Sequence, residues 1–374
     1  MTTANLYYAQ PLLASLSEVF DVNSATAGAL ITFTQIGFVA GVLFLVPLGD
    51  RIEKRRLVTL LLGVTTLALA VAGVATSFPI LLIASVVSGA TSVVTQILIA
   101  LAAGLTPDHA RGKVVGQVMS GLLTGILLSR TVSSLVSEFA GWRVVYLGSA
   151  VLMVFVAVAL RLALPALPAT TGVSYGKVLR STAGLIRSHP LLLRRGLYQA
   201  AMFAAFSAFW TTVSFVLTGP DFGFSAVGVG LFALLGLVGA AWAQVVGRWA
   251  DRGWVRPLTG SAFVVAAVAF TLAGFGGRTI VLIALAAVLL DVAVQTTLIT
   301  GQHTVYQLDP GARARLNSVF IATFFIGGAA GSQLGAIAFN VGGWSAVAAF
   351  GAVLPVLALL YWTTERRSGA RATS

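Results

Sequence analysis

The chain has 374 residues, of which 58% are hydrophobic and only 9% are charged, and its mean hydropathy is +0.96. Soluble domains carry about 25% charged residues, so too few charges are present to cover a surface that faces water, and a soluble protein is excluded. The absence of cysteine also excludes disulfide frameworks, thiolate metal sites and thiol catalysis. An integral membrane protein is therefore predicted.

The N-terminal residues 1–20 read MTTANLYYAQPLLASLSEVF. Their apolar stretch is shorter than the ~20 residues that a bilayer core requires. We expect an incomplete first span, which a wrongly assigned start site or a truncated chain would explain, and a real protein with eleven and a half spans is the alternative. A cleaved signal peptide is not expected, because no basic segment precedes the apolar stretch.

Eleven apolar segments of spanning length follow, and they are predicted to be helical because they run unbroken without alternation of polar and apolar residues. Glycines at four-residue spacing, as in Gly327, Gly331 and Gly335, predict close helix packing in lipid. The predicted spans are 25–48, 57–76, 79–104, 114–138, 143–164, 196–217, 226–247, 257–276, 279–304, 316–341 and 344–362.

The basic residues lie almost entirely in alternate loops and in the C-terminal tail. Of the 23 Lys and Arg residues, the three exceptions are Arg130 within a span and Arg143 and Arg278 on the opposite side. Because basic loops stay in the cytoplasm, the basic loops and the C-terminus are predicted to be cytoplasmic. The net charge of +12 is therefore interpreted as a topology signal.

Two halves of the chain repeat each other. Asp50-Arg51 recurs as Asp251-Arg252, and Gly141-Trp142 recurs as Gly343-Trp344. Parallel repeats of this kind, related by an axis along the membrane normal, form one large class of transporters. The predicted organisation is a six-span half at 1–164 with its first span incomplete, a basic cytoplasmic linker at 165–195, a second six-span half at 196–363, and a cytoplasmic tail at 364–374.

The segment after the 25–48 span resembles the signature loop GxxxDRxGRR of the major facilitator superfamily, in particular its twelve-span drug:proton antiporter and sugar-efflux branch. Asp50, Arg51, Lys54 and Arg55 match this signature, whereas Val46 and Glu53 replace its two glycines. The resemblance covers essentially the whole chain and implies an all-α bundle of two six-helix halves. It also implies that this loop, with Asp251 and Arg252 in the second half, latches the outward-facing state. The alternative is that these charges only enforce topology.

The span at 114–138 resembles the antiporter motif GxxxxxxxxGxxxGPxxGG of the same family. Gly116, Gly125 and Ser129 fit this motif, Arg130 occupies the position of its proline, and Ser133-Ser134 replace its last two glycines. The charge of Arg130 thus lies within a motif that the family associates with antiport.

Arg130 and Asp291 are the two ionisable residues expected deep within spans, where a charge is expensive unless it faces a cavity or a partner. Because desolvation penalises a charged carboxyl group, Asp291 is predicted to bind the coupling proton. Arg130, which stays protonated, is predicted to shape the electrostatics of the pathway. The alternative is a structural role for both, paired with each other or with backbone carbonyls.

Polar and aromatic side chains on the spans that line the central cavity in the family give further candidates. Each is equally compatible with a hydrogen bond between helices. The predicted cavity residues are Asn5, Tyr8, Gln35, Gln96, Gln199, Trp210, Gln244 and Gln295, while Trp142, Trp344 and Trp362 near span ends are predicted interfacial anchors.

The predicted function is secondary active efflux of a small drug-like or sugar-like molecule, driven by proton antiport with alternating access. Uptake by proton symport or facilitated diffusion is one alternative, and a non-transporting membrane assembly or sensor protein is another. The predicted partners are the substrate, protons and the lipid bilayer. No enzyme activity, metal, cofactor or nucleic acid is expected, and the proton gradient supplies the energy. A monomer in the bacterial inner membrane is predicted.

Overall fold

The computed structural model describes residues 2–106, 108–165, 175–276, 279–309 and 312–371, and these residues contain helices and no strand. They divide into two compact units: unit 1 comprises Met1–Ser188 and Phe224–Leu234, and unit 2 comprises His189–Gly223 and Leu235–Ser374. Eight helical stretches in the described part are long and apolar enough to cross a membrane, and two of them, Ala226–Phe275 and Arg313–Glu365, each contain a break.

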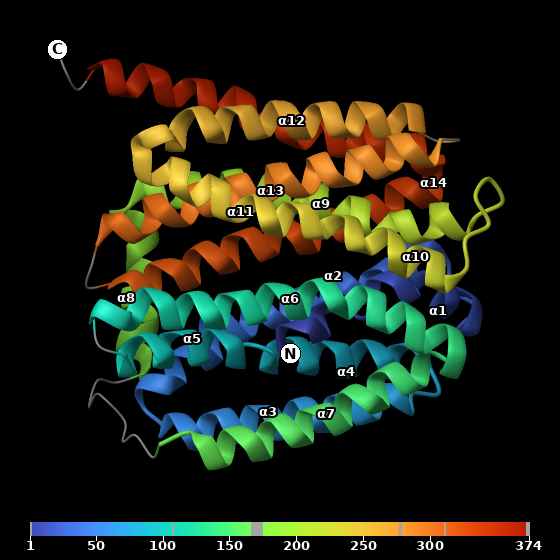
Figure 1. Ribbon diagram of the computed structural model, residues 1–374, viewed down its shortest axis with the longest axis horizontal. Coiled ribbons are helices and arrows are strands. Elements are labelled where there is room, and N and C mark those ends of the chain that lie inside the picture. The colour runs from blue at the N-terminus through green and yellow to red at the C-terminus, as the bar shows by residue number, and fades with distance from the viewer. Residues whose placement is uncertain (1, 107, 166–174, 277–278, 310–311, 372–374) are drawn as a thin grey trace. The chain divides into compact units, whose positions relative to one another are not determined.

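Unit 1 is a bundle in which α3 packs beside α7 and α2 packs beside α4 (Figure 1). Its N-terminal residues form two short, buried helical turns and then a short helix that buries Leu13 and Leu16. The helices are η1 (Thr2–Leu6), η2 (Gln10–Leu12), α1 (Leu13–Val19), α2 (Ser24–Ala40), η3 (Gly41–Leu45), η4 (Val46–Asp50), α3 (Lys54–Gly73), α4 (Phe78–Thr91), α5 (Val94–Leu105), α6 (Asp108–Ala140), α7 (Trp142–Ala163), α8 (Tyr175–Ser188) and α10 (Ala226–Ala233).

Unit 2 is a second bundle, in which α9 packs along α14, and α13 lies against both α11 and α12. Its long helices are again mainly apolar over their spanning stretches, as expected for segments that cross lipid, where a helix satisfies its own backbone hydrogen bonds. They are α9 (Pro190–Thr218), α11 (Leu237–Trp249), α12 (Val255–Phe275), α13 (Ile280–Leu308) and α14 (Arg313–Arg371), with the short turn η6 (Ala250–Trp254) between α11 and α12. The turn η5 (Leu234–Gly236) begins at the last residue of unit 1 and leads into α11.

The segment predicted as a linker at 165–195 contains two helical parts. Residues 166–174 lie outside the described residues, 175–188 form α8, and α9 already begins at Pro190. The short helix α10 packs on α6 within unit 1, where Thr131 donates a hydrogen bond to the carbonyl oxygen of Gly230 at 2.8 Å. A side chain on Gly230 would come within 2.6 Å of the Ser134 Cβ, so glycine permits this close packing.

The repeated Gly-Trp pair marks the same kind of helix junction in both halves. Gly141 and Gly343 have φ values of 82° and 63°, a left-handed conformation that glycine adopts without strain. The chain reverses at each, and the following Trp142 and Trp344 are buried, with the Trp344 indole donating to the Ala273 carbonyl oxygen at 2.7 Å. The prediction that these two tryptophans are interfacial anchors is therefore wrong, because the turn directs them into their own bundles.

The glycines of α14 confirm the predicted close packing. Cβ atoms on Gly327 and Gly331 would overlap the backbone of Ala200 and Ala204 on α9, and one on Gly335 would lie 2.7 Å from the Ala208 Cα. Small residues at this spacing let two helix backbones come into contact, and the van der Waals packing that results stabilises helix association in lipid.

We expect Gly331→Ala to destabilise unit 2 by about 1–3 kcal/mol, because the added methyl forces the two backbones apart. The thermal unfolding midpoint of the purified protein in detergent would measure the loss. Gly247→Ala is the matched control, since a Cβ on this helical glycine meets nothing within 4 Å. Equal midpoints for the two variants would contradict the close contact.

Candidate functional site

The buried arginine of unit 1 is held by the N-terminal segment. Arg130 is 3% exposed on α6, where its Nε donates to the Gln10 Oε1 at 2.8 Å and its guanidinium lies 5.2 Å from the centre of the Tyr7 ring. It stands ten residues before the helix end at Ala140, or about 15 Å at 1.5 Å per residue. A permanent positive charge is thus fixed deep within an apolar bundle.

The same N-terminal segment carries two predicted cavity residues. Tyr8 is 7% exposed, and its carbonyl oxygen accepts a hydrogen bond from Ser133 of α6 at 2.7 Å. Asn5 is 6% exposed, and its side-chain amide has no hydrogen-bond partner among the described residues. Thr3 donates to Thr95 of α5 at 2.9 Å, so the segment is tied to two helices of unit 1.

Two further predicted residues of unit 1 lie on other helices. Gln35 is 1% exposed on α2, and Gln96 is half-buried on α5. Gln10, which was not predicted, contacts Arg130 directly. A glutamine within the short apolar stretch was the signal in the sequence that could have identified it.

The buried carboxyl group of unit 2 lies on α13. Asp291 is 6% exposed and stands eleven residues after Ile280, about 16 Å along the helix. A Cβ on Gly239 of α11 would come within 2.8 Å of the Asp291 Cβ, so α11 passes closely over the carboxyl-bearing residue. On the next turn of α13, Gln295 is half-buried, and Thr296 accepts a hydrogen bond from the Trp242 indole at 3.0 Å.

The remaining predicted cavity residues of unit 2 differ in burial. On α9, Gln199 and Trp210 are 1% and 3% exposed, and Trp210 packs against Phe206 and Phe209. On α11, by contrast, Gln244 is exposed. The structure thus gives α9 a buried polar and aromatic face, whereas the side chain of Gln244 on α11 is exposed.

The two predicted latch segments are both helix junctions. The side chain of Asp50 lies outside the described residues, Arg51 is exposed, and Lys54 and Arg55 are half-buried at the start of α3. The second segment, with Asp251 and Arg252 exposed, forms η6. There the Asp251 carboxylate lies 3.4 Å from the His303 Nε2 of α13.

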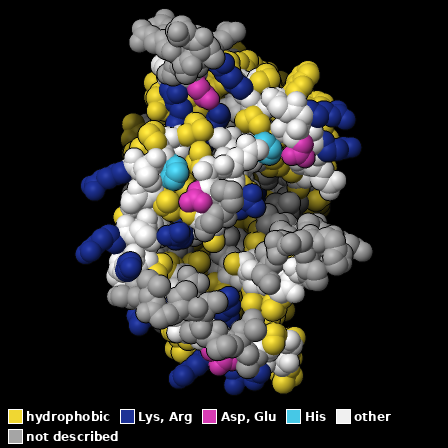
Figure 2. Space-filling model, turned by 90° about the vertical axis from the view of Figure 1, so that its left-hand side faces the viewer, with side chains coloured by type: hydrophobic (Ala, Val, Ile, Leu, Met, Phe, Trp, Pro, Cys, Tyr) yellow, Lys and Arg dark blue, Asp and Glu magenta, His cyan; other side chains and the backbone are white. Residues whose placement is uncertain are grey.

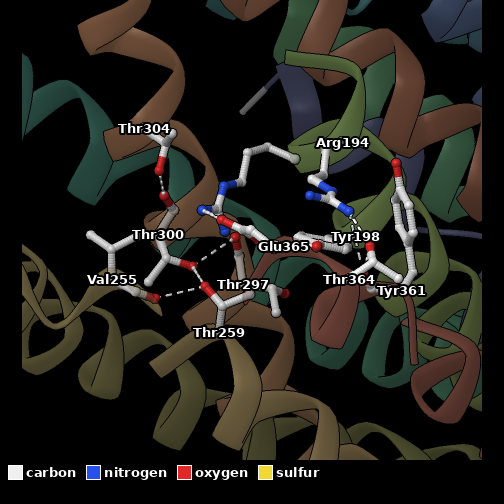
Figure 3. Close-up of polar contacts among 11 residues, drawn as sticks. Arg194, Tyr198, Val255, Thr259, Thr297, Thr300, Thr304, Tyr361, Thr364 and Glu365 are labelled. Carbon is white, nitrogen blue, oxygen red and sulfur yellow. Dashed lines mark hydrogen bonds and ion pairs between the residues drawn. The ribbon is translucent and has the colours of Figure 1, made fainter. Parts of the chain in front are cut away.

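Sequence reasoning missed an ionic cluster at one end of unit 2 (Figure 3). Arg195 was assigned to a loop, but it lies in the second turn of α9 with its side chain 6% exposed, and it pairs with Glu365 of α14 at 2.8 Å. The Tyr198 hydroxyl donates to the second carboxylate oxygen of Glu365 at 3.1 Å. The helix α9 begins six residues before the predicted span at 196–217, so Arg195 fell outside that span and was not predicted to be buried.

Nearby, threonines link α12 and α13 (Figure 3). Thr259 donates to Thr300 at 3.1 Å, and the Thr304 hydroxyl donates to the Thr300 carbonyl oxygen at 2.9 Å. The first bond joins the two helices and helps to fix their register without a charge, whereas the second lies within α13.

Chemically, the described residues of each unit contain a buried charge part-way along an apolar helix, Arg130 in unit 1 and Asp291 in unit 2. No group of three His, Asp or Glu side chains in the described part of the chain could hold a metal ion. Lys and Arg side chains gather on the face shown in Figure 2, which looks onto the ends of helices. A charge within apolar helices is costly unless it faces a cavity or a partner, so Arg130 and Asp291 are the candidate functional residues.

Comparison with known proteins gives the family. The chain is 38% identical over 362 residues to "Uncharacterized transporter YgaY" of Escherichia coli O157:H7, covering 97% of this chain and 92% of the relative. It is 25% identical to the "Probable sugar efflux transporter" of Helicobacter acinonychis (strain Sheeba), covering 94% of this chain and 88% of the relative. It is 27% identical to the "Chloramphenicol resistance protein" of Streptomyces lividans, covering 87% of this chain and 83% of the relative.

The fold is that of solved transporters. A crystal structure of the nucleoside transporter NupG, in a mutant form, matches with a TM-score of 0.77 at 15% identity, covering 97% of this chain and 98% of that one. The family model described as "Major Facilitator Superfamily" matches residues 1–309. With its apolar helical spans and its repeated halves, this chain belongs to the major facilitator superfamily of multi-pass membrane transporters.

Proposed function

We propose that the protein exports a small drug-like or sugar-like molecule in exchange for protons. The observation that carries this proposal is Asp291, a carboxyl group buried part-way along an apolar 29-residue helix. A carboxyl group can bind and release a proton, and in this proposal Asp291 does so as access to it changes. If the protonated and deprotonated forms favour different conformations, proton binding and release drive the conformational change, and the proton gradient is thereby coupled to transport.

Arg130 has the complementary role in this proposal. It remains charged through the cycle, is held by Gln10 and Tyr7, and sets the potential along the pathway. The polar residues Asn5, Tyr8, Gln35, Gln96, Gln199, Trp210, Gln244 and Gln295 are proposed to contact the substrate. The names of the sugar-efflux and chloramphenicol-resistance relatives support export and the two substrate classes.

The proposed mechanism is alternating access between the two repeated halves. The segments with Asp50, Arg51, Lys54 and Arg55, and with Asp251 and Arg252, bias which side is open. The distribution of Lys and Arg supports an inner-membrane protein with its C-terminus in the cytoplasm, acting as a monomer without a cofactor.

The proposal is tested in energised everted vesicles that contain the protein, with a pH-sensitive dye inside. We expect candidate drugs or sugars to release internal protons, because export in the cell corresponds to uptake into everted vesicles. Vesicles without the protein are the control. Folded protein that moves substrate without any pH response would favour facilitated transport. Acidification of the vesicle interior as substrate enters would favour symport, because proton and substrate then move in the same direction.

A further inference from the structure

Three arginine side chains converge at one end of unit 2, the end proposed to face the cytoplasm. Arg194 and Arg195 lie on α9, Arg256 lies on α12, and the charges of Arg194 and Arg256 both act on Arg195. The carboxylate that the structure places among them is Glu365, which pairs with Arg195. Among the described side chains, the cluster therefore holds three positive charges against one negative charge.

Aromatic side chains fix the two outer arginines. The Arg194 guanidinium lies 4.5 Å from the centre of the Tyr361 ring, and the Arg256 guanidinium lies 5.4 Å from that of Trp362. Arg194 also donates to Thr364. Stacking on a ring orients a guanidinium without consuming its in-plane N–H donors, so both groups keep donors for a further acceptor.

Several of these donors are buried without an acceptor among the described residues. They belong to all three arginines and to the neighbouring indole. The atoms are Arg194 Nε, Arg195 Nε and Nη1, Arg256 Nε and Nη2, and Trp362 Nε1. Arg195 itself is 5% exposed, so its unused donors cannot simply face bulk water. A buried donor without an acceptor is costly, and several such donors on positively charged side chains at one place suit an anionic group that can accept from them.

We propose that this cluster, defined by Arg194, Arg195, Arg256 and Trp362, binds a phosphate group, either that of an anionic phospholipid headgroup or a free phosphate ion. Guanidinium groups match the oxygens of phosphate in charge and geometry. The Glu365 carboxylate pairs with the Nη2 of Arg195, so it competes with the phosphate for this guanidinium group. Arg194 and Arg256 are half-buried and provide the accessible side of the cluster.

The test uses the full chain in nanodiscs of phosphatidylcholine, of phosphatidylcholine with phosphatidylglycerol, or of phosphatidylcholine with added inorganic phosphate at constant ionic strength. Thermal unfolding is followed against ligand concentration, because a ligand of the folded state raises the midpoint. Stabilisation by phosphatidylglycerol alone identifies the headgroup, and stabilisation by inorganic phosphate identifies the free ion. No stabilisation of the unmodified protein by either overturns the proposal.

The double variant Arg194→Gln/Arg256→Gln should raise the half-saturating concentration about tenfold or more, since charged hydrogen bonds are lost. Lys177→Gln/Arg180→Gln removes the same charge from exposed positions of α8 and should leave the concentration unchanged. An equal loss in this control would show unspecific attraction and overturn the proposal.

A single variant separates a binding site from a structural ion pair without depending on the double variant. Glu365→Gln removes the competing charge and keeps the side-chain shape, so the half-saturating concentration should fall about tenfold. An unchanged or higher half-saturating concentration in this variant would overturn the proposal.

Discussion

Asp291→Asn is expected to abolish substrate-induced proton release, while exchange of labelled for unlabelled substrate continues. The amide has nearly the shape of the carboxyl group but cannot bind a transferable proton, so the translocation step remains while its coupling is lost. Internal pH and labelled-substrate counterflow, measured on the same vesicles, give the two readouts. The expected drop in proton release is at least about a hundredfold, the lower end of what one positioned proton-transfer group contributes.

Asp221→Asn is the matched control, because it makes the same chemical change at an exposed position of unit 2. It should leave both readouts unchanged. If Asp291→Asn retained full proton-coupled transport, the carboxyl group would not carry the coupling proton. Loss of both readouts together would indicate that Asp291 supports the α11–α13 contact at Gly239 instead of coupling.

Arg130→Gln is expected to reduce transport by about ten- to a hundredfold, because a buried charge-assisted hydrogen bond contributes ~1.5–3 kcal/mol and the charge itself is removed. Arg130→Lys keeps the charge but loses the planar Nε donor that reaches Gln10 at 2.8 Å, so it should recover only part of the rate. Transport rates and folded yield of each variant would be compared.

A double variant shows how Arg130 acts. If Arg130 acts through its hydrogen bond to Gln10, the double variant Gln10→Leu/Arg130→Gln should transport no more slowly than Arg130→Gln alone. The effects of substitutions within one hydrogen-bond network are not additive. Fully additive losses would contradict that coupling. Ser181→Ala, on α8, serves as a control for a polar loss elsewhere in unit 1 and should transport normally.

The sequence predicted the membrane class, the helical spans and the family, because these depend on composition and on long-range pattern. The eleven predicted spans fall on helical segments of the structure, although 25–48, 79–104 and 226–247 are each divided among two or more elements, and 316–341 and 344–362 both lie within α14. The four-residue glycine spacing of α14 packs as expected. It also identified Arg130 and Asp291 as buried charges, since charged residues within long apolar runs are rare enough to stand out. Their roles in coupling stay predictions.

Other features depend on contacts between residues far apart in the chain, which no local pattern records. The pairing of Arg195 with Glu365 joins α9 to a residue 170 positions away, and Gln10 reaches Arg130 over 120 positions. Trp142 and Trp344 looked like interfacial anchors, but glycine turns bury them. Hydropathy therefore determined which segments enter the lipid, whereas helix packing decided which polar groups meet, because each contact depends on the register and rotation of two helices together.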